Sequence, residues 1–220
     1  MRPRLQDRVR RSDNRGWNRS TQATVTARER AIGWAREVAV DPMAVYLDTE
    51  TTGLDGQAEI VDLAVIAGDG EVLLDTLIRP VRSIPLVASG IHGIRDADVA
   101  DAPTWDDVFA EFGRVTQGRR IVVYNADFDK RIVSQCCAQY ALASPEVVWQ
   151  CAMRAYAEFC AEPGQSGGFK WHRLDRAAYR FGISPGGHRA LADAKVCRAV
   201  VLGMAQLVVE DAGLDDSIPF

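Results

Sequence analysis

The apolar positions in the first part of the chain predict one helix followed by three strands. Five apolar residues recur at the spacing of an amphipathic helix over about 26–39, which Asp41-Pro42 ends: Ala27, Ala31, Trp34, Ala35 and Val38. Short apolar runs then predict strands over 44–48, 59–67 and 71–78, and the turn Gly68-Asp69-Gly70 joins the last two into a hairpin. Residues 80–103 show neither the helical nor the strand spacing of apolar residues and are expected to be irregular.

The remaining apolar positions predict helices that alternate with strands. Thr104 is placed to cap a helix over about 105–115, and a fully apolar strand follows at 121–124. Further apolar positions predict a helix over 128–140, a strand at 147–149 and a last helix over about 189–209. An antiparallel trio extended by parallel strands behind crossover helices is an α/β fold, with a mixed five-stranded sheet flanked by helices.

Charge divides the chain into two unequal parts. The formal net charge is −4 over 220 residues, but residues 1–30 hold nine Arg against three acidic residues, so their balance is +6 and that of the remainder is −10. Residues 1–20 have almost no apolar side chains and are expected to form a disordered Arg-rich arm before one domain over 21–220. No apolar run approaches the ~18 residues of a membrane span, and no apolar stretch follows the basic start, so a cytoplasmic protein is expected. Five cysteines without a C-x-x-C pair favour free thiols.

The end of the first strand carries two acidic residues, Asp48 and Glu50, on either side of Thr49. Residues two apart in a strand point to one face, so both carboxylates can meet at one point while Thr49 faces away. Two adjacent carboxylates repel each other unless they are protonated or neutralised by a cation. Acidic residues at a strand end are also common as solvated turn formers, so this pair alone does not identify a site.

Two later segments carry chemistry at the start of a helix. In Tyr-Asn-Ala-Asp-Phe-Asp, Asn125 suits the N-cap and the helix dipole favours acids such as Asp129 in the first turn, which is a sufficient structural account. His188 and Asp193 lie five residues apart, about 140° around a helix, so both cannot face one site from within it. Gly186-Gly187 allows His188 to precede the helix and bend back.

Three segments occur together in the order found in one family: Leu-Asp-Thr-Glu-Thr-Thr-Gly-Leu, Asn-Ala-Asp-Phe-Asp and His-Arg-Ala-Leu-Ala-Asp-Ala. Over about residues 45–207 the chain resembles the DnaQ-like 3′→5′ exonucleases of the DEDDh group, in the ribonuclease H-like superfamily. The resemblance implies four metal ligands, Asp48, Glu50, Asp129 and Asp193, and a general base, His188, all five being catalytic. A related group uses Tyr four residues before the last Asp, where this chain has Arg189.

The resemblance also implies contacts with substrate. Thr51 and Leu54 match positions that touch the terminal nucleotide, and Asn125 and Phe128 of the second segment are assigned to substrate binding as well. His92 matches a recurrent tripeptide, and a loop-structuring role is expected for it. Tyr124 stands where family members often have His, a position that is not a metal ligand in the family.

The implied reaction is hydrolysis at the 3′ end of a nucleic acid that releases nucleoside 5′-monophosphates. Carboxylate ligands suit two Mg²⁺ or Mn²⁺ ions, and single-stranded DNA is the expected substrate, with RNA possible. The short segment after the last helix favours a stand-alone repair or processing role. Alternatives are an exoribonuclease, a proofreading subunit associated with a polymerase, and a nucleic-acid-binding module that has lost catalysis.

The segment Lys170-Trp171-His172-Arg173 has two interpretations. Its basic and aromatic side chains are of the kind that stack on bases and contact phosphates. The start of an ordinary amphipathic helix, with an apolar stripe at Leu174, Ala177, Ala178 and Phe181, explains it equally well.

Overall fold

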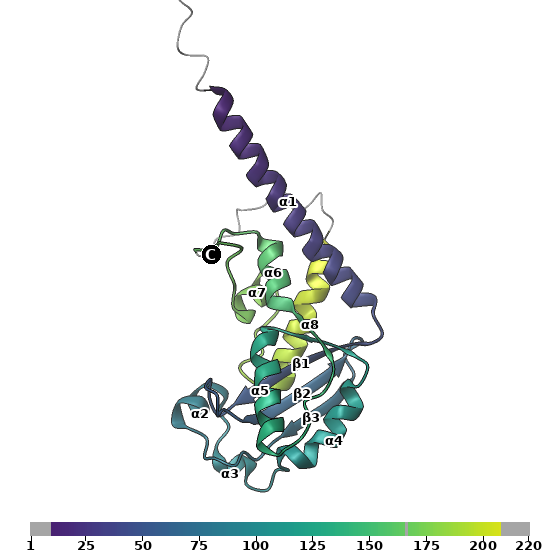
Figure 1. Ribbon diagram of the computed structural model, residues 1–220, viewed down its shortest axis with the longest axis vertical. Helices are drawn as coiled ribbons and strands as arrows, with labels where there is room; N and C mark the ends of the chain where they lie inside the picture. The colour runs from purple at the N-terminus through teal and green to yellow at the C-terminus, as the bar shows by residue number, and fades with distance from the viewer. Residues whose placement is uncertain (1–9, 166, 208–220) are drawn as a thin grey trace, which may run out of the picture.

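The computed structural model describes residues 10–165 and 167–207, and for residues 10–23 it describes only the backbone. Its centre is one five-stranded sheet in the order β3-β2-β1-β4-β5. Figure 1 labels β1, β2 and β3 of this sheet. The strands are β1 (Ala44–Thr51), β2 (Ile60–Ala67), β3 (Val72–Leu77), β4 (Arg120–Val123) and β5 (Val148–Cys151). β1, β2 and β3 pair antiparallel, whereas β4 and β5 extend β1 in parallel. The predicted mixed α/β sheet, with its hairpin and its antiparallel trio, is therefore confirmed.

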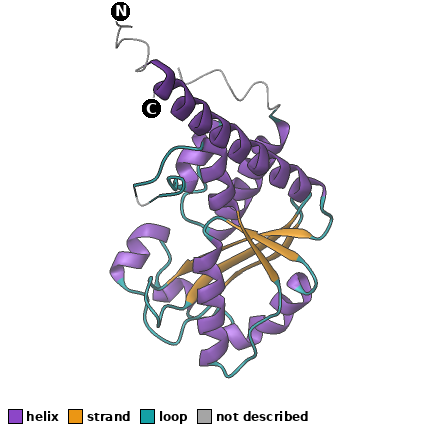
Figure 2. Cartoon of the chain, turned by 45° about the horizontal axis from the view of Figure 1, so that its top comes forward, coloured by secondary structure: helices purple, strands orange, loops and turns teal. Residues whose placement is uncertain are grey.

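Helices cover both faces of the sheet (Figure 2). One face packs against α1 (Arg10–Val40), α6 (Ala152–Cys160), α7 (Leu174–Arg180) and α8 (Ala190–Gln206). The other packs against α4 (Trp105–Thr116) and α5 (Ala126–Gln139). Alternation along β1 supplies both cores, because Tyr46 enters the first while Val45 and Leu47 enter the second. β1 is thus buried on both sides, and its polar end is held in a fixed place.

The N-terminal helix is longer than the sequence predicts. Ala27, Ala31, Ala35 and Val38 are buried against α6 and α8, as their spacing indicates, and the helix ends at Val40 before Asp41-Pro42. It begins at Arg10, within the Arg-rich arm expected over residues 1–20, and residues 1–9 of that arm lie outside the described part. Once the packed segment is helical, each added residue gains a backbone hydrogen bond without a new nucleation cost, and Arg is a good helix former.

The stretch over residues 80–103, expected to be irregular, contains two short helices, α2 (Leu86–His92) and α3 (Asp96–Val99). Gly93, with φ 76°, ends α2, and the backbone N–H of Arg95 donates to the Asp98 side chain at the start of α3. Helices of one or two turns are too short to show a period, which is why the apolar pattern missed them. Side chains of this segment form a small separate core around Val61.

Two local expectations have different outcomes. Thr104 is the N-cap of α4 as predicted, and its backbone N–H donates to the Asp107 carboxylate at 3.0 Å. Asn125 occupies the N-cap position of α5 as predicted, but its φ is 78° and its side chain makes no capping hydrogen bond. Asn tolerates this left-handed conformation better than most residues. All five cysteines are free thiols, and among the described residues no helix has the length and apolar character to cross a membrane.

Candidate active site

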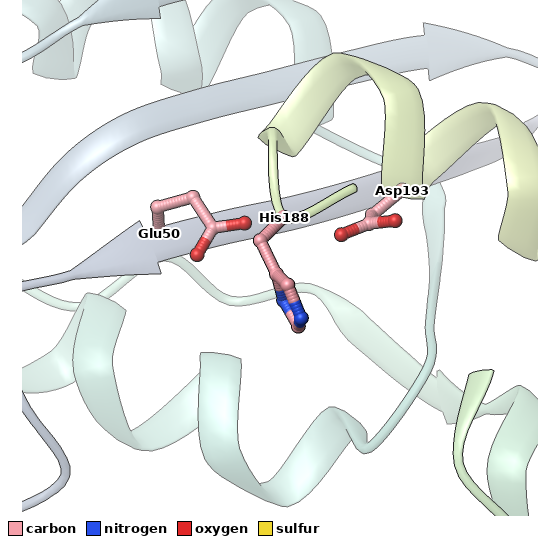
Figure 3. Close-up of side chains that lie close together, drawn as sticks. All are labelled: Glu50, His188 and Asp193. Carbon is pink, nitrogen blue, oxygen red and sulfur yellow. The ribbon is translucent and has the colours of Figure 1, made fainter. Parts of the chain in front are cut away.

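Three predicted site residues converge where β1 ends beside the start of α8. Side-chain ligand atoms of Glu50, His188 and Asp193 all lie within 4.8 Å of one another (Figure 3). Glu50 is buried on β1, Asp193 is half-buried in the first turn of α8, and His188 is exposed in the loop before it. The structure therefore brings together residues from the two ends of the domain.

The backbone before α8 turns back as the sequence predicts. Gly187 has φ 78° and His188 has φ 58°, a left-handed conformation that few residues other than glycine adopt. A Cβ on Gly186 would lie 2.1 Å from the Asp193 Oδ1, so only glycine fits there. This turn places His188 outside the helix and lets it share a site with Asp193, which a continuous helix would prevent.

Asp48 and Asp129 form the other part of the site. Asp129, in the first turn of α5, is 3% exposed. Burial raises the pKa of Asp48 well above its usual range, and among neighbouring charges Asp129 contributes most to that rise. These two carboxylates do not belong to the three-residue cluster of Glu50, His188 and Asp193, but all four acids lie close enough for Asp193 and Glu50 to raise the pKa of Asp48 further.

The acidic residues destabilise one another's charged forms. Burial, followed by the charges of Asp193 and Asp62, raises the pKa of Glu50 from 4.5 to about 8. Burial raises the pKa of Asp129 to about 7, against the opposing effect of a hydrogen bond from Thr49. Burial also raises the pKa of Asp193, although His188 partly opposes it. Such a cluster takes up protons or cations, and its hard oxygen donors fit Mg²⁺ or Mn²⁺ better than softer metals.

Thr49 contributes to the site in a way that the sequence reasoning missed. Strand alternation points it away from Asp48 and Glu50, as predicted, but toward α5, where its hydroxyl donates to Asp129 Oδ1 at 2.7 Å. Both groups are buried, so this hydrogen bond fixes one carboxylate oxygen of Asp129. The only signal in the sequence was that a polar residue stood between two acids.

Asp62 was also missed. It lies on β2 opposite Glu50, is 2% exposed, and its Oδ2 accepts hydrogen bonds from Arg189 Nε at 2.9 Å and from the backbone N–H of Ala190 at 3.3 Å. These contacts anchor the start of α8 immediately after His188. In the sequence, Asp62 is the one acidic residue within the apolar run of β2. That pattern could have identified it, because a buried charge requires a partner.

The residues assigned to substrate surround this end of β1. Thr51 is buried and its hydroxyl donates to the Gly53 carbonyl at 2.7 Å, whereas Leu54 is 79% exposed. Phe128 is half-buried beneath Arg131, whose guanidinium also donates to the Leu54 carbonyl at 3.1 Å. Leu54 and Phe128 are thus linked through one side chain, while Asn125 is exposed at the start of α5.

His92 is buried, and its Nδ1 accepts a hydrogen bond from the backbone N–H of Ile94 at 3.1 Å. This contact ties the end of α2 to the following turn and agrees with the expected loop-structuring role. Asp127, two residues before Asp129, is exposed and pairs with Arg154. Asp127 and Asp129 therefore lie in the same helical turn but in different environments.

Comparisons with known proteins agree with this geometry. The sequence pattern of the exonuclease family RNase T matches residues 45–201. The uncharacterized exonuclease CP81 of Escherichia phage 186 is 38% identical over 194 residues, covering 84% of this chain and 96% of the phage protein. DNA polymerase III subunit epsilon of Treponema pallidum is 31% identical over 156 residues, covering 68% and 70%. The nuclease domain of 3′hExo, a DEDDh family member solved with rAMP, superimposes with a TM-score of 0.61 at 18% identity, covering 74% of this chain and 91% of that one.

Proposed function

Since this chain belongs to the RNase T family of exonucleases, within its DnaQ-like DEDDh group, we propose that it removes nucleotides from the 3′ end of single-stranded DNA. The products are nucleoside 5′-monophosphates. The observation that carries the proposal is the convergence of Glu50, His188 and Asp193, with the half-buried Asp48 and the buried Asp129 beside them. Five groups from three segments that are distant in the sequence lie near the end of β1. If Asp48 and Glu50 were only solvated turn formers, such a convergence would not be needed.

Each acidic group has a defined part in this proposal. Asp48, Glu50, Asp129 and Asp193 would hold two Mg²⁺ or Mn²⁺ ions. The pKa of each of these carboxyl groups is raised above its usual range, so a bound cation would stabilise their charged forms. When bound, such ions supply positive charge that activates the attacking water and stabilises the leaving oxygen. Thr49 and Asp62 keep the carboxylate and the helix start in position.

His188 acts as the general base. Its side chain is exposed and next to Glu50 and Asp193, so it can reach a water molecule that attacks the scissile phosphorus. The water oxygen forms a bond to phosphorus, its proton passes to the imidazole, and the bond from phosphorus to the 3′ oxygen of the preceding nucleotide breaks. That oxygen then takes a proton from solvent.

Two features support a DNA strand with an accessible end as the substrate. Leu54 is an exposed apolar side chain in the loop after β1, where it can contact the terminal base. The exposed Asn125 and the half-buried Phe128 are assigned to the same contact, whereas the buried Thr51 would act through that loop, because its hydroxyl donates to the Gly53 carbonyl. The Treponema relative is named as a subunit of a DNA polymerase, which favours DNA over RNA.

The test is digestion of a 5′-labelled oligonucleotide, as DNA and as RNA of one sequence, with Mg²⁺, Mn²⁺ or EDTA. We expect a ladder that shortens from the 3′ end, a faster reaction on DNA, and none in EDTA. Asp129→Asn should abolish the ladder, whereas the matched control Asp127→Asn, two residues away but exposed, should retain it. Binding without cleavage would contradict the proposal and support a binding module instead, and faster digestion of RNA would reassign the substrate.

A further inference from the structure

A pocket of about 560 Å³ includes part of the catalytic cluster in its lining and extends beyond the residues that the reaction described so far uses. Its lining includes His188 and Asp193, and also Trp171, Arg173 and Tyr179. The pocket is therefore continuous with the place where the phosphodiester bond would break. Its volume lies within the range of about 300–1,000 Å³ that is typical of small-molecule sites.

Two large aromatic side chains of this pocket remain in contact with solvent. Trp171 is 62% exposed and Tyr179 is 65% exposed, and among the described residues no other Trp, Tyr or Phe is a largely exposed side chain. Packing of α7 explains why Ala177 and Ala178 are buried in the core, but it does not explain why Trp171 stays outside it. The interpretation of this segment as the start of an amphipathic helix therefore explains the buried face of α7 but leaves the exposed Trp171 unexplained.

The loop that carries Trp171 is held by several contacts, so the indole is presented from an ordered position. The backbone N–H of Lys170 donates to the Glu162 carbonyl at 2.9 Å, and the Tyr124 hydroxyl donates to the His172 carbonyl at 3.0 Å. The imidazole of His172 packs edge-on against Tyr156. The residues on both sides of Trp171 are thus fixed to the body of the domain while its own ring faces outward.

We propose that this pocket is a base-binding subsite, in which an unpaired base of the substrate strand stacks on Trp171 with Tyr179 and Arg173 beside it. The inference rests on the proposed exonuclease function and adds to it a second contact with the single strand, at an unpaired base beside the catalytic cluster. Aromatic rings bind bases with little sequence preference, because every base has a π face, and Arg adds an attraction for base and phosphate. A base in a duplex is already stacked on both sides and must first be released.

The test compares Trp171→Ala, Trp171→Phe and the matched surface control Val40→Ala. Val40 is 81% exposed at the end of α1 and does not line the pocket. Binding of a labelled single strand is measured in Ca²⁺, and KM and kcat are measured in Mg²⁺. We expect Trp171→Ala to raise Kd and KM by about 5- to 100-fold, the usual effect of losing one stacked base, with kcat unchanged. Trp171→Phe should restore most of the affinity, and Val40→Ala should match the wild type.

A second part of the test compares single-stranded with blunt duplex substrates. On a blunt duplex of the same length, Trp171→Ala and the wild type should bind equally, because no unpaired base is available for the pocket. Moving a single abasic residue along the last nucleotides of the strand should remove the difference between the two proteins at one position, which identifies the stacked base.

Each result distinguishes the subsite from the exonuclease. Normal Kd and KM for Trp171→Ala on single strands, or an equal loss on blunt duplexes, would overturn the subsite even if the 3′ ladder is present. Loss of binding in Trp171→Ala with rescue by Trp171→Phe would support the subsite even if the wild type cleaved nothing, in which case the proposed exonuclease function fails by itself.

Discussion

Glu50→Gln should stabilise the metal-free protein at pH 8 and have little effect at pH 5. The pKa of Glu50 is raised from 4.5 to about 8 by burial and by the charges of Asp193 and Asp62. Between these two pH values the folded state therefore holds more protons than the unfolded state, so the free energy of unfolding falls as pH rises. The stability contributed by protonated Glu50 is complete below pH 4.5 and is lost as pH passes through about 8. Gln keeps the neutral form at every pH.

The size of the effect follows from the pKa change. At about 1.4 kcal/mol per pH unit, a rise from 4.5 to about 8 sets a ceiling of about 5 kcal/mol. Because the neighbouring acids take up protons too and relieve part of the repulsion, we expect about 2–5 kcal/mol at pH 8. For a chain of this size that corresponds to a rise in Tm of about 4–20 °C.

The assay is thermal unfolding in EDTA at several values between pH 5 and pH 8.5. Glu71→Gln, which changes an exposed residue in the turn between β2 and β3, is the matched control and should follow the wild type. Adding Mn²⁺ at pH 8 should raise the Tm of the wild type more than that of Glu50→Gln, because a bound cation removes the repulsion and the variant lacks one ligand. Parallel curves of Tm against pH for the wild type and Glu50→Gln in EDTA would refute the reasoning.

Three further changes probe single contacts of the site. His188→Ala should lower kcat by about 10²- to 10⁴-fold while single-strand binding persists, and single-turnover rates equal to the wild type would remove its role as base. Asp62→Asn weakens the hydrogen bonds that hold Arg189 and Ala190 at the start of α8. We therefore expect kcat to fall by up to about 10²-fold with KM little changed. A change confined to KM would contradict a role of Asp62 in positioning His188. Thr49→Val removes the 2.7 Å hydrogen bond to Asp129. It should lower the free energy of unfolding, measured in urea at pH 8, by about 1.5–3 kcal/mol, because the Asp129 carboxylate is ionised at that pH. An equally large loss at pH 5 would indicate that packing, and not the hydrogen bond, is responsible.

The elements of the core were predictable because each leaves a local pattern. The spacing of Ala27, Ala31, Ala35 and Val38 identified the packed part of α1, and apolar runs identified β1, β2 and β4. The order of the strands followed from their connections, since an antiparallel hairpin and parallel crossovers allow few arrangements. The short helices α2 and α3, and the start of α1 at Arg10, left no such pattern and were missed.

For the site, the sequence by itself determined which residues are chemically suited to it and the local geometry of each: Asp48 and Glu50 on one face of a strand, and His188 before a helix that begins after two glycines. Only the tertiary structure decided which groups meet. That Thr49 bonds Asp129, that Asp62 anchors the start of α8, and that Trp171 remains exposed beside His188 depend on how separate elements pack. A sequence pattern reports the face of a single element, whereas the partner of that face is set by register and burial across the whole core.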